Sequence, residues 1–131
     1  MTPEQFFKSV IGHPWENGAI GPDAFDCWGL VRAYYLQVRG IELPIVDVDA
    51  TRSMAVAHAF AGHAELASWQ EVDAPSEGDA VLMGQNLRPN HVGLWLRGGV
   101  LHSIQGGGVI YTTPLMLRHS GWNILGNYRH I

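Results

Sequence analysis

Cysteine is scarce in this chain, because Cys27 is the single cysteine among 131 residues. A lone thiol excludes an intramolecular disulfide and any zinc site that needs several thiolates. It leaves the redox compartment open, since a single thiol persists in most compartments. Any cysteine chemistry must therefore come from this one residue.

Positive charge and long apolar runs are also scarce. The chain has Lys+Arg 8 against Asp+Glu 12 and a formal net charge of −4. Without a basic run or stripe, nucleic acid is not expected as the main partner. No stretch approaches the ~18 apolar residues of a membrane span, and MTPEQFFKSV does not have the pattern of a signal peptide. We therefore expect cytoplasmic synthesis, with delivery by another particle if the target lies outside the cell.

The chain does have enough apolar residues, 47%, to build a core for one domain over residues 1–131. Helical periodicity and caps predict helices over about residues 3–11, 26–39 and 52–67. Short β-favouring segments, most of them separated by Gly or Pro, predict strands at 69–72, 79–83, 91–96, 100–104, 109–112 and 124–129. Helices followed by strands indicate an α+β fold with an antiparallel sheet.

Cys27 lies at the predicted start of the second helix, in the segment FDCWGL. Backbone N–H groups in a first helical turn carry partial positive charge, which favours a thiolate and can stabilise an oxyanion. Asp26 works against this, because a neighbouring carboxylate disfavours the thiolate. We expect Asp26 to act mainly as the N-cap of the helix. A lone cysteine on an inner helix face is more often a small buried apolar residue.

A base for such a thiol is expected from the segment NHVGLWLRGGVLHS, which reads as a β-hairpin. His91 opens its first strand and His102 lies in the second. If Arg97 and Gly98 form the turn, His102 lies opposite Gly93, diagonal to His91 and close enough for the rings to meet. If the turn is moved on by one residue, His102 lies opposite Trp95 and is too far away. The sequence leaves this register open.

Four segments in order resemble the NlpC/P60 family of papain-like cysteine peptidases. They are HPWENGAIGPDAFDCWGLV, EGDAVLM, NHVGLWL and VLHS. The resemblance implies helices packed on a small antiparallel sheet, with Cys27 as nucleophile, His91 as base and His102 as the residue that orients the base. It also implies hydrolysis of peptidoglycan stem peptides between D-glutamate and the diamino acid, with no metal and no organic cofactor.

Two positions depart from the family pattern. Trp15 replaces the tyrosine that supports the oxyanion, and its indole N–H can donate one hydrogen bond. Trp28 replaces the serine after the cysteine. Both tryptophans are core candidates that can also form walls of the cleft. The Cys-Trp pair is similar to the branch of the family found in bacteriophage tail proteins, which makes phage tail proteins candidate partners.

The sequence therefore predicts a cysteine endopeptidase with a Cys-His-His triad that acts on the cell wall and is carried by a phage or prophage tail. Two other functions stay open. One is a structural tail-assembly protein that keeps the fold without activity. The other is a thiol amidase or acyltransferase that acts on a different amide.

Overall fold

The computed structural model describes residues 1–44, 68–85 and 88–131. Two helices come first, α1 (Pro3–Val10) and α2 (Cys27–Arg39). The remaining elements are β1 (Trp69–Val72), β2 (Ala80–Gln85), β3 (Arg88–Leu96), β4 (Gly99–Ile104), β5 (Gly108–Thr112), α4 (Pro114–His119) and β6 (Asn123–His130). The helix predicted over 52–67 lies outside the described residues.

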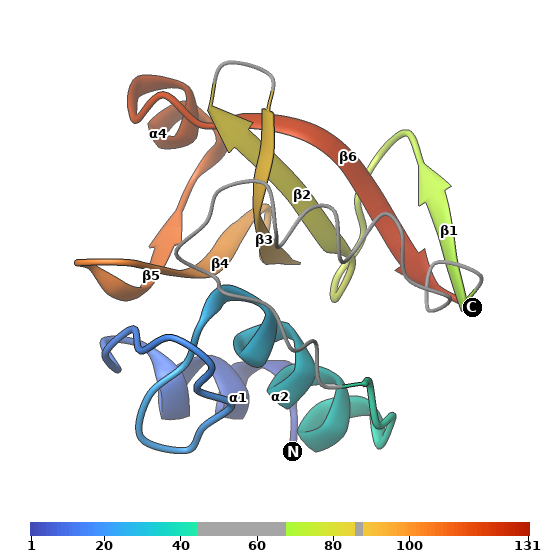
Figure 1. Cartoon of the computed structure of the whole chain (residues 1–131). Helices are drawn as coiled ribbons and strands as arrows, with labels where there is room; N and C mark the ends of the chain where they lie inside the picture. The colour runs from blue at the N-terminus through green and yellow to red at the C-terminus, as the bar shows by residue number, and fades with distance from the viewer. Residues whose placement is uncertain (45–67, 86–87) are drawn as a thin grey trace.

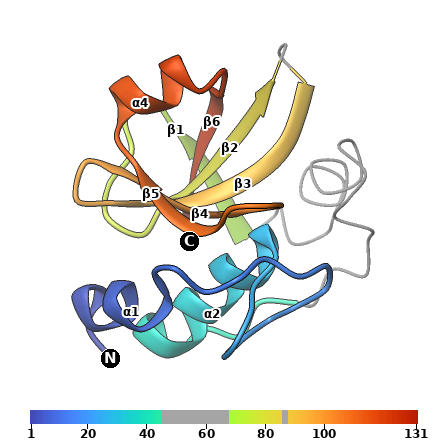
Figure 2. The same ribbon diagram turned by 90° about the vertical axis from the view of Figure 1, so that its left-hand side faces the viewer.

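All six predicted strands are present, and they form one antiparallel sheet in the order β1-β6-β2-β3-β4-β5. The helices α1 and α2 lie below this sheet in Figures 1 and 2, while α4 lies above it. The predicted α+β fold, with N-terminal helices packed on a small antiparallel sheet, is confirmed.

The ends of α1 and α2 follow from local sequence. Thr2 and Gln5 form the predicted capping box at the start of α1. At the start of α2, Asp26 is the N-cap, and Gly40 ends the helix in the left-handed conformation at φ 66°. Each cap supplies hydrogen-bond partners to backbone groups that the helix itself leaves unpaired.

Apolar side chains pack on both faces of the sheet. The larger cluster joins the sheet to α1 and α2 and includes Phe6, Leu30, Tyr35, Leu94 and Leu101. A smaller cluster lies on the α4 side and consists of Val81, Met83, Val100 and Leu117, with Trp95 and Trp122 packed against it. The second face is thus covered by a helix that the sequence interpretation did not include.

Candidate active site

The local structure around Cys27 is fixed by its neighbour Asp26. One carboxylate oxygen, Oδ1, accepts the backbone N–H of Gly29 at 2.6 Å, and Oδ2 accepts that of Gly18 at 3.1 Å. The expected role of Asp26 as a helix cap is confirmed. Cys27 is consequently the first residue of α2, where its own backbone N–H and that of Trp28 act to lower the pKa of its thiol.

The β3–β4 hairpin has the register that brings its two histidines together. Leu96 pairs with Gly99 and Leu94 with Leu101, so Arg97 and Gly98 form the turn. Both turn residues have positive φ, 51° and 74°, as a two-residue type I′ turn requires. The alternative register, with the turn one residue later, is excluded.

Gly93 allows the two strands to approach at this point. A Cβ atom there would lie 3.0 Å from Cβ of His102 and 2.7 Å from Cγ1 of Val100. The space next to Gly93 is therefore not open. The room is occupied by the neighbouring strand, and that close approach is what carries His102 to His91.

His91, His102 and Thr112 form a buried polar chain. Nε2 of His91 lies 2.8 Å from Nδ1 of His102, and Nε2 of His102 lies 2.8 Å from Oγ1 of Thr112. All three side chains are buried. Both nitrogens of His102 are thereby engaged, while His91 keeps Nδ1 for another partner.

The thiol of Cys27 reaches the same strand. The backbone N–H of Val92, the residue directly after His91, acts on this thiol and lowers its pKa. Strands β3 and β4 are paired from the pair of Leu96 with Gly99 to the pair of Leu94 with Leu101. Val92 precedes Leu94 on β3 and therefore lies outside this paired part. The start of α2 therefore packs against β3 close to the point where β3 leaves this ladder.

Burial sets the protonation states of the thiol and the base. Only 3% of Cys27 is exposed. Desolvation, followed by the Asp26 carboxylate, raises the pKa of the thiol to about 12. Desolvation and the proximity of His102 lower the pKa of His91 well below its ordinary value. Both shifts favour a neutral thiol and a neutral imidazole, whereas the helix terminus alone suggested a thiolate.

Trp122 covers one face of the base, and the sequence interpretation missed it. Its ring stacks on His91 with centroids 4.8 Å apart and an interplanar angle of 30°. The turn after α4 places it there: the N–H of Trp122 bonds to the carbonyl of Leu117, and Gly121 adopts φ 82°. This is a Schellman motif. A signal for α4 was available, with Thr113 as cap, Pro114 at the first position and Gly121 just past the end.

The two tryptophans of the predicted cleft occupy different environments. Trp28 is 7% exposed, and its indole N–H donates to the carbonyl of Pro44 at 2.9 Å. The core interpretation is therefore the right one for Trp28. Trp15 is half-buried and lies with Pro14 against the glycine turn 106–108, around a hollow of about 340 Å³. Its support of an oxyanion stays a prediction.

Within residues 1–44, 68–85 and 88–131, no group of three or more His, Cys, Asp or Glu side chains is arranged to hold a metal ion. In the same part of the chain, no helix combines the length and the apolar character needed to cross a membrane.

Comparisons with known proteins show which family this chain resembles. A profile of the NlpC/P60 family matches residues 12–123. Tail tip assembly protein K of Escherichia phage N15 is 37% identical over 87 residues, which cover 63% of this chain. The same alignment covers 36% of the phage protein, so the chain spans about a third of that relative's length.

Two solved structures illustrate the shared fold. The NlpC/p60 domain of the peptidoglycan hydrolase SagA aligns with a TM-score of 0.60 and 22% identity, over 98% of this chain and 94% of that one. RipD of Mycobacterium tuberculosis aligns with a TM-score of 0.60 and 22% identity, over 98% and 93% of the two chains. RipD is described as a non-catalytic NlpC/p60 domain protein adapted to peptidoglycan binding.

Proposed function

The chain belongs to the NlpC/P60 family, and we propose that it is a cysteine peptidase that hydrolyses the stem peptides of peptidoglycan, at the amide between D-glutamate and the diamino acid. The observation that carries this proposal is the 2.8 Å contact between His91 and His102. Val92, the residue after His91, also acts on the Cys27 thiol through its backbone N–H. A nucleophile, a base and a group that orients the base are the parts that thiol acyl transfer requires.

In the proposed mechanism, Nδ1 of His91 takes the proton of the Cys27 thiol while the sulfur attacks the amide carbonyl. General-base assistance suits a pair that is neutral at rest. Backbone N–H groups at the start of α2, with Trp15 as a further donor, stabilise the oxyanion. Protonated His91 then gives its proton to the leaving amine, and water hydrolyses the thioester. His102 keeps Nε2 of His91 engaged throughout, which fixes the tilt of the base.

We also propose that the protein works as part of a phage or prophage tail. The support is its similarity to a tail tip assembly protein. A tail particle would carry the protein to the cell wall.

A second candidate is a peptidoglycan-binding or structural tail protein without activity. The deep burial of Cys27 and the raised pKa of its thiol favour this candidate, as does the existence of a non-catalytic relative with the same fold. A third possibility, an amidase or acyltransferase for another amide, would use the same three side chains.

Incubation of the purified chain with a defined L-Ala-γ-D-Glu-diaminopimelate tripeptide, followed by mass spectrometry, distinguishes these functions. We expect cleavage after D-glutamate by the wild type and none by Cys27→Ala, whose unfolding curve should match the wild type. Equal product from both proteins would remove Cys27 from the mechanism. Binding without cleavage would support the second candidate, and cleavage only of other amides would support the third.

A further inference from the structure

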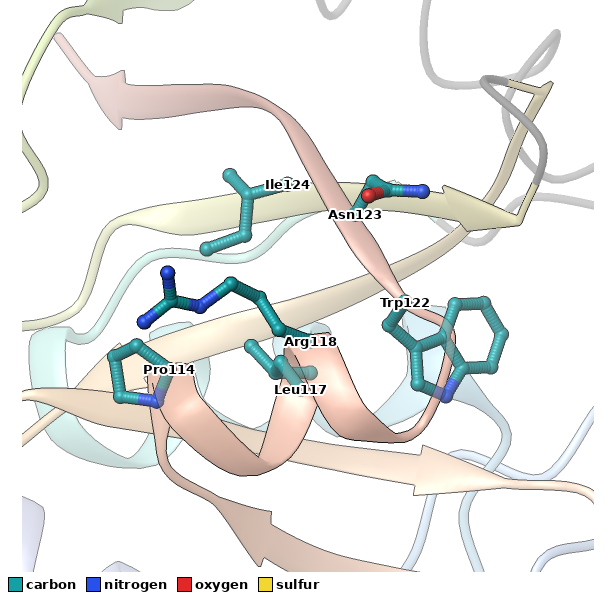
Figure 3. Close-up of a pocket in the computed structure, with 6 residues that line it drawn as sticks. All are labelled: Pro114, Leu117, Arg118, Trp122, Asn123 and Ile124. Atoms are coloured by element: carbon teal, nitrogen blue, oxygen red, sulfur yellow. The ribbon is translucent and has the colours of Figure 1, made fainter.

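A hollow of about 290 Å³ opens on the α4 side of the sheet, outside the three residues of the proposed triad. It is bounded by α4 and the start of β6 (Figure 3). Its lining residues are Pro114, Leu117, Arg118, Trp122, Asn123 and Ile124. Its volume is close to the lower end of the range for small-molecule sites, which suits one or two residues of a peptide.

The lining of this hollow is apolar except for one cation and one amide. The buried side chain of Leu117 belongs to the smaller core cluster. Arg118 extends across the hollow between Pro114 and Ile124 (Figure 3). Among the described residues, no carboxylate lies within ion-pair distance of Arg118. A guanidinium of this kind, flanked by apolar walls, is suited to a carboxylate that is attached to a short aliphatic chain.

Trp122 connects the hollow to the histidine pair. It lines the hollow and also stacks on His91, with ring centroids 4.8 Å apart. A ligand in the hollow therefore lies one indole ring away from the proposed base. Because the chain carries a net charge of −4, an acidic peptide gains little from the overall field, and a local cation matters more to its binding.

We propose that this hollow is a subsite for a free carboxylate of the substrate peptide, paired with Arg118 and packed against Trp122 and Ile124. This inference rests on the proposed function. A stem peptide offers two such groups next to the scissile amide: the α-carboxylate of γ-linked D-glutamate, and the side-chain carboxylate of a diaminopimelate. Both groups would be recognised by the same chemistry.

The test measures binding separately from turnover, by calorimetry in the Cys27→Ala background. Three tripeptides, each amidated at its C-terminus, serve as probes: one with both carboxylates, one with the D-glutamate α-carboxylate also amidated, and one with lysine in place of diaminopimelate. Arg118→Gln removes the charge, Arg118→Lys keeps it without the planar fork, and Arg39→Gln on α2 is the matched control for loss of a surface arginine.

We expect Arg118→Gln to weaken binding of the double-carboxylate peptide by about tenfold, Arg118→Lys to weaken it less, and Arg39→Gln to leave it unchanged. The probe whose affinity no longer depends on Arg118 identifies the carboxylate that is bound. Equal affinity of Arg118→Gln and the parent for all three probes would overturn the inference, and so would absence of binding by the parent. Binding that depends on Arg118 without cleavage by the wild type would retain the subsite and reject the peptidase.

Discussion

The hydroxyl group of Thr112 has a defined part in the proposed mechanism, because it lies at the far end of the histidine chain. Two proton arrangements satisfy the contacts from His91 to His102 and from His102 to Thr112. In one, His91 donates from Nε2, His102 donates to Thr112, and Nδ1 of His91 is a free acceptor. In the other, His102 donates to His91, which then carries its proton on Nδ1. Only the first arrangement leaves a base for the thiol.

Replacing Thr112 by Val should therefore lower kcat with little change in KM. The substitution keeps the side-chain shape but removes the acceptor, which leaves an N–H of His102 unsatisfied in a buried site, at a cost of about 1–3 kcal/mol. A loss of that size in the transition state corresponds to roughly 5- to 150-fold in kcat.

Thr112→Ser, which retains the hydroxyl, is the matched control and should keep most of the activity. Steady-state kinetics on the tripeptide across pH 5–9 provides the measurement. If Val and Ser variants lose activity equally, the hydroxyl has no role in positioning the base.

The β3–β4 hairpin was the most predictable element of the site. Arg97 and Gly98 could form a two-residue turn, and strand parity then required His102 to lie opposite Gly93. Both register options could be written from the sequence, but choosing between them needed the positive φ values of the turn. Thr112 could not be placed in advance, since its contact with His102 depends on the pairing of a third strand.

Gly93 provides a test of this element. A Cβ atom there would lie 2.7 Å from Cγ1 of Val100 and 3.1 Å from the carbonyl oxygen of Leu101. The Cγ1 methyl group of Val100 can shift, whereas the carbonyl of Leu101 is held in the sheet. We expect Gly93→Ala to lower the free energy of unfolding by about 1–3 kcal/mol, and to reduce activity by separating His102 from His91.

Urea unfolding and tripeptide turnover are the measurements for this variant. Val100→Ala removes the nearest contact, so the double variant should recover part of the loss caused by Gly93→Ala, as a double-mutant cycle would report. Unchanged stability and turnover in Gly93→Ala would contradict the close approach of the two strands.

The whole molecule joins two apolar clusters through one sheet, and the proposed site lies where features of both sides meet. Cys27 belongs to the cluster on the helix side, while Trp122 packs against the cluster on the α4 side and stacks on His91. Sequence patterns located the motifs along the chain, but they could not indicate how much water each group loses on folding. Desolvation is a property of the assembled fold, and for this reason the raised pKa of Cys27 and the lowered pKa of His91 were not foreseen.

These buried groups make the stability of the molecule depend on pH. Burial lowers the pKa of His102 from 6.5 to about 4. Between these values the unfolded chain binds a proton that the folded chain does not, so the free energy of unfolding must fall as the pH decreases from 6.5 to about 4. His102 alone contributes a loss of about 3 kcal/mol, and His91 adds to it in the same direction.

Two other buried groups set the limits of this dependence. The raised pKa of Asp26 acts in the opposite sense at the acidic end, because the folded state there holds its proton more tightly. The raised pKa of Cys27 reduces stability only above pH ~9, where an unfolded thiol ionises. We therefore expect greatest stability between about pH 6.5 and 9.

Urea unfolding at half-unit intervals from pH 4 to 10 measures how the free energy of unfolding depends on pH. His102→Gln is the control, and it should show a smaller decrease on the acidic side. Equal unfolding free energies at pH 4.5 and pH 7 in the wild type would mean that the histidine pair is not held neutral by burial.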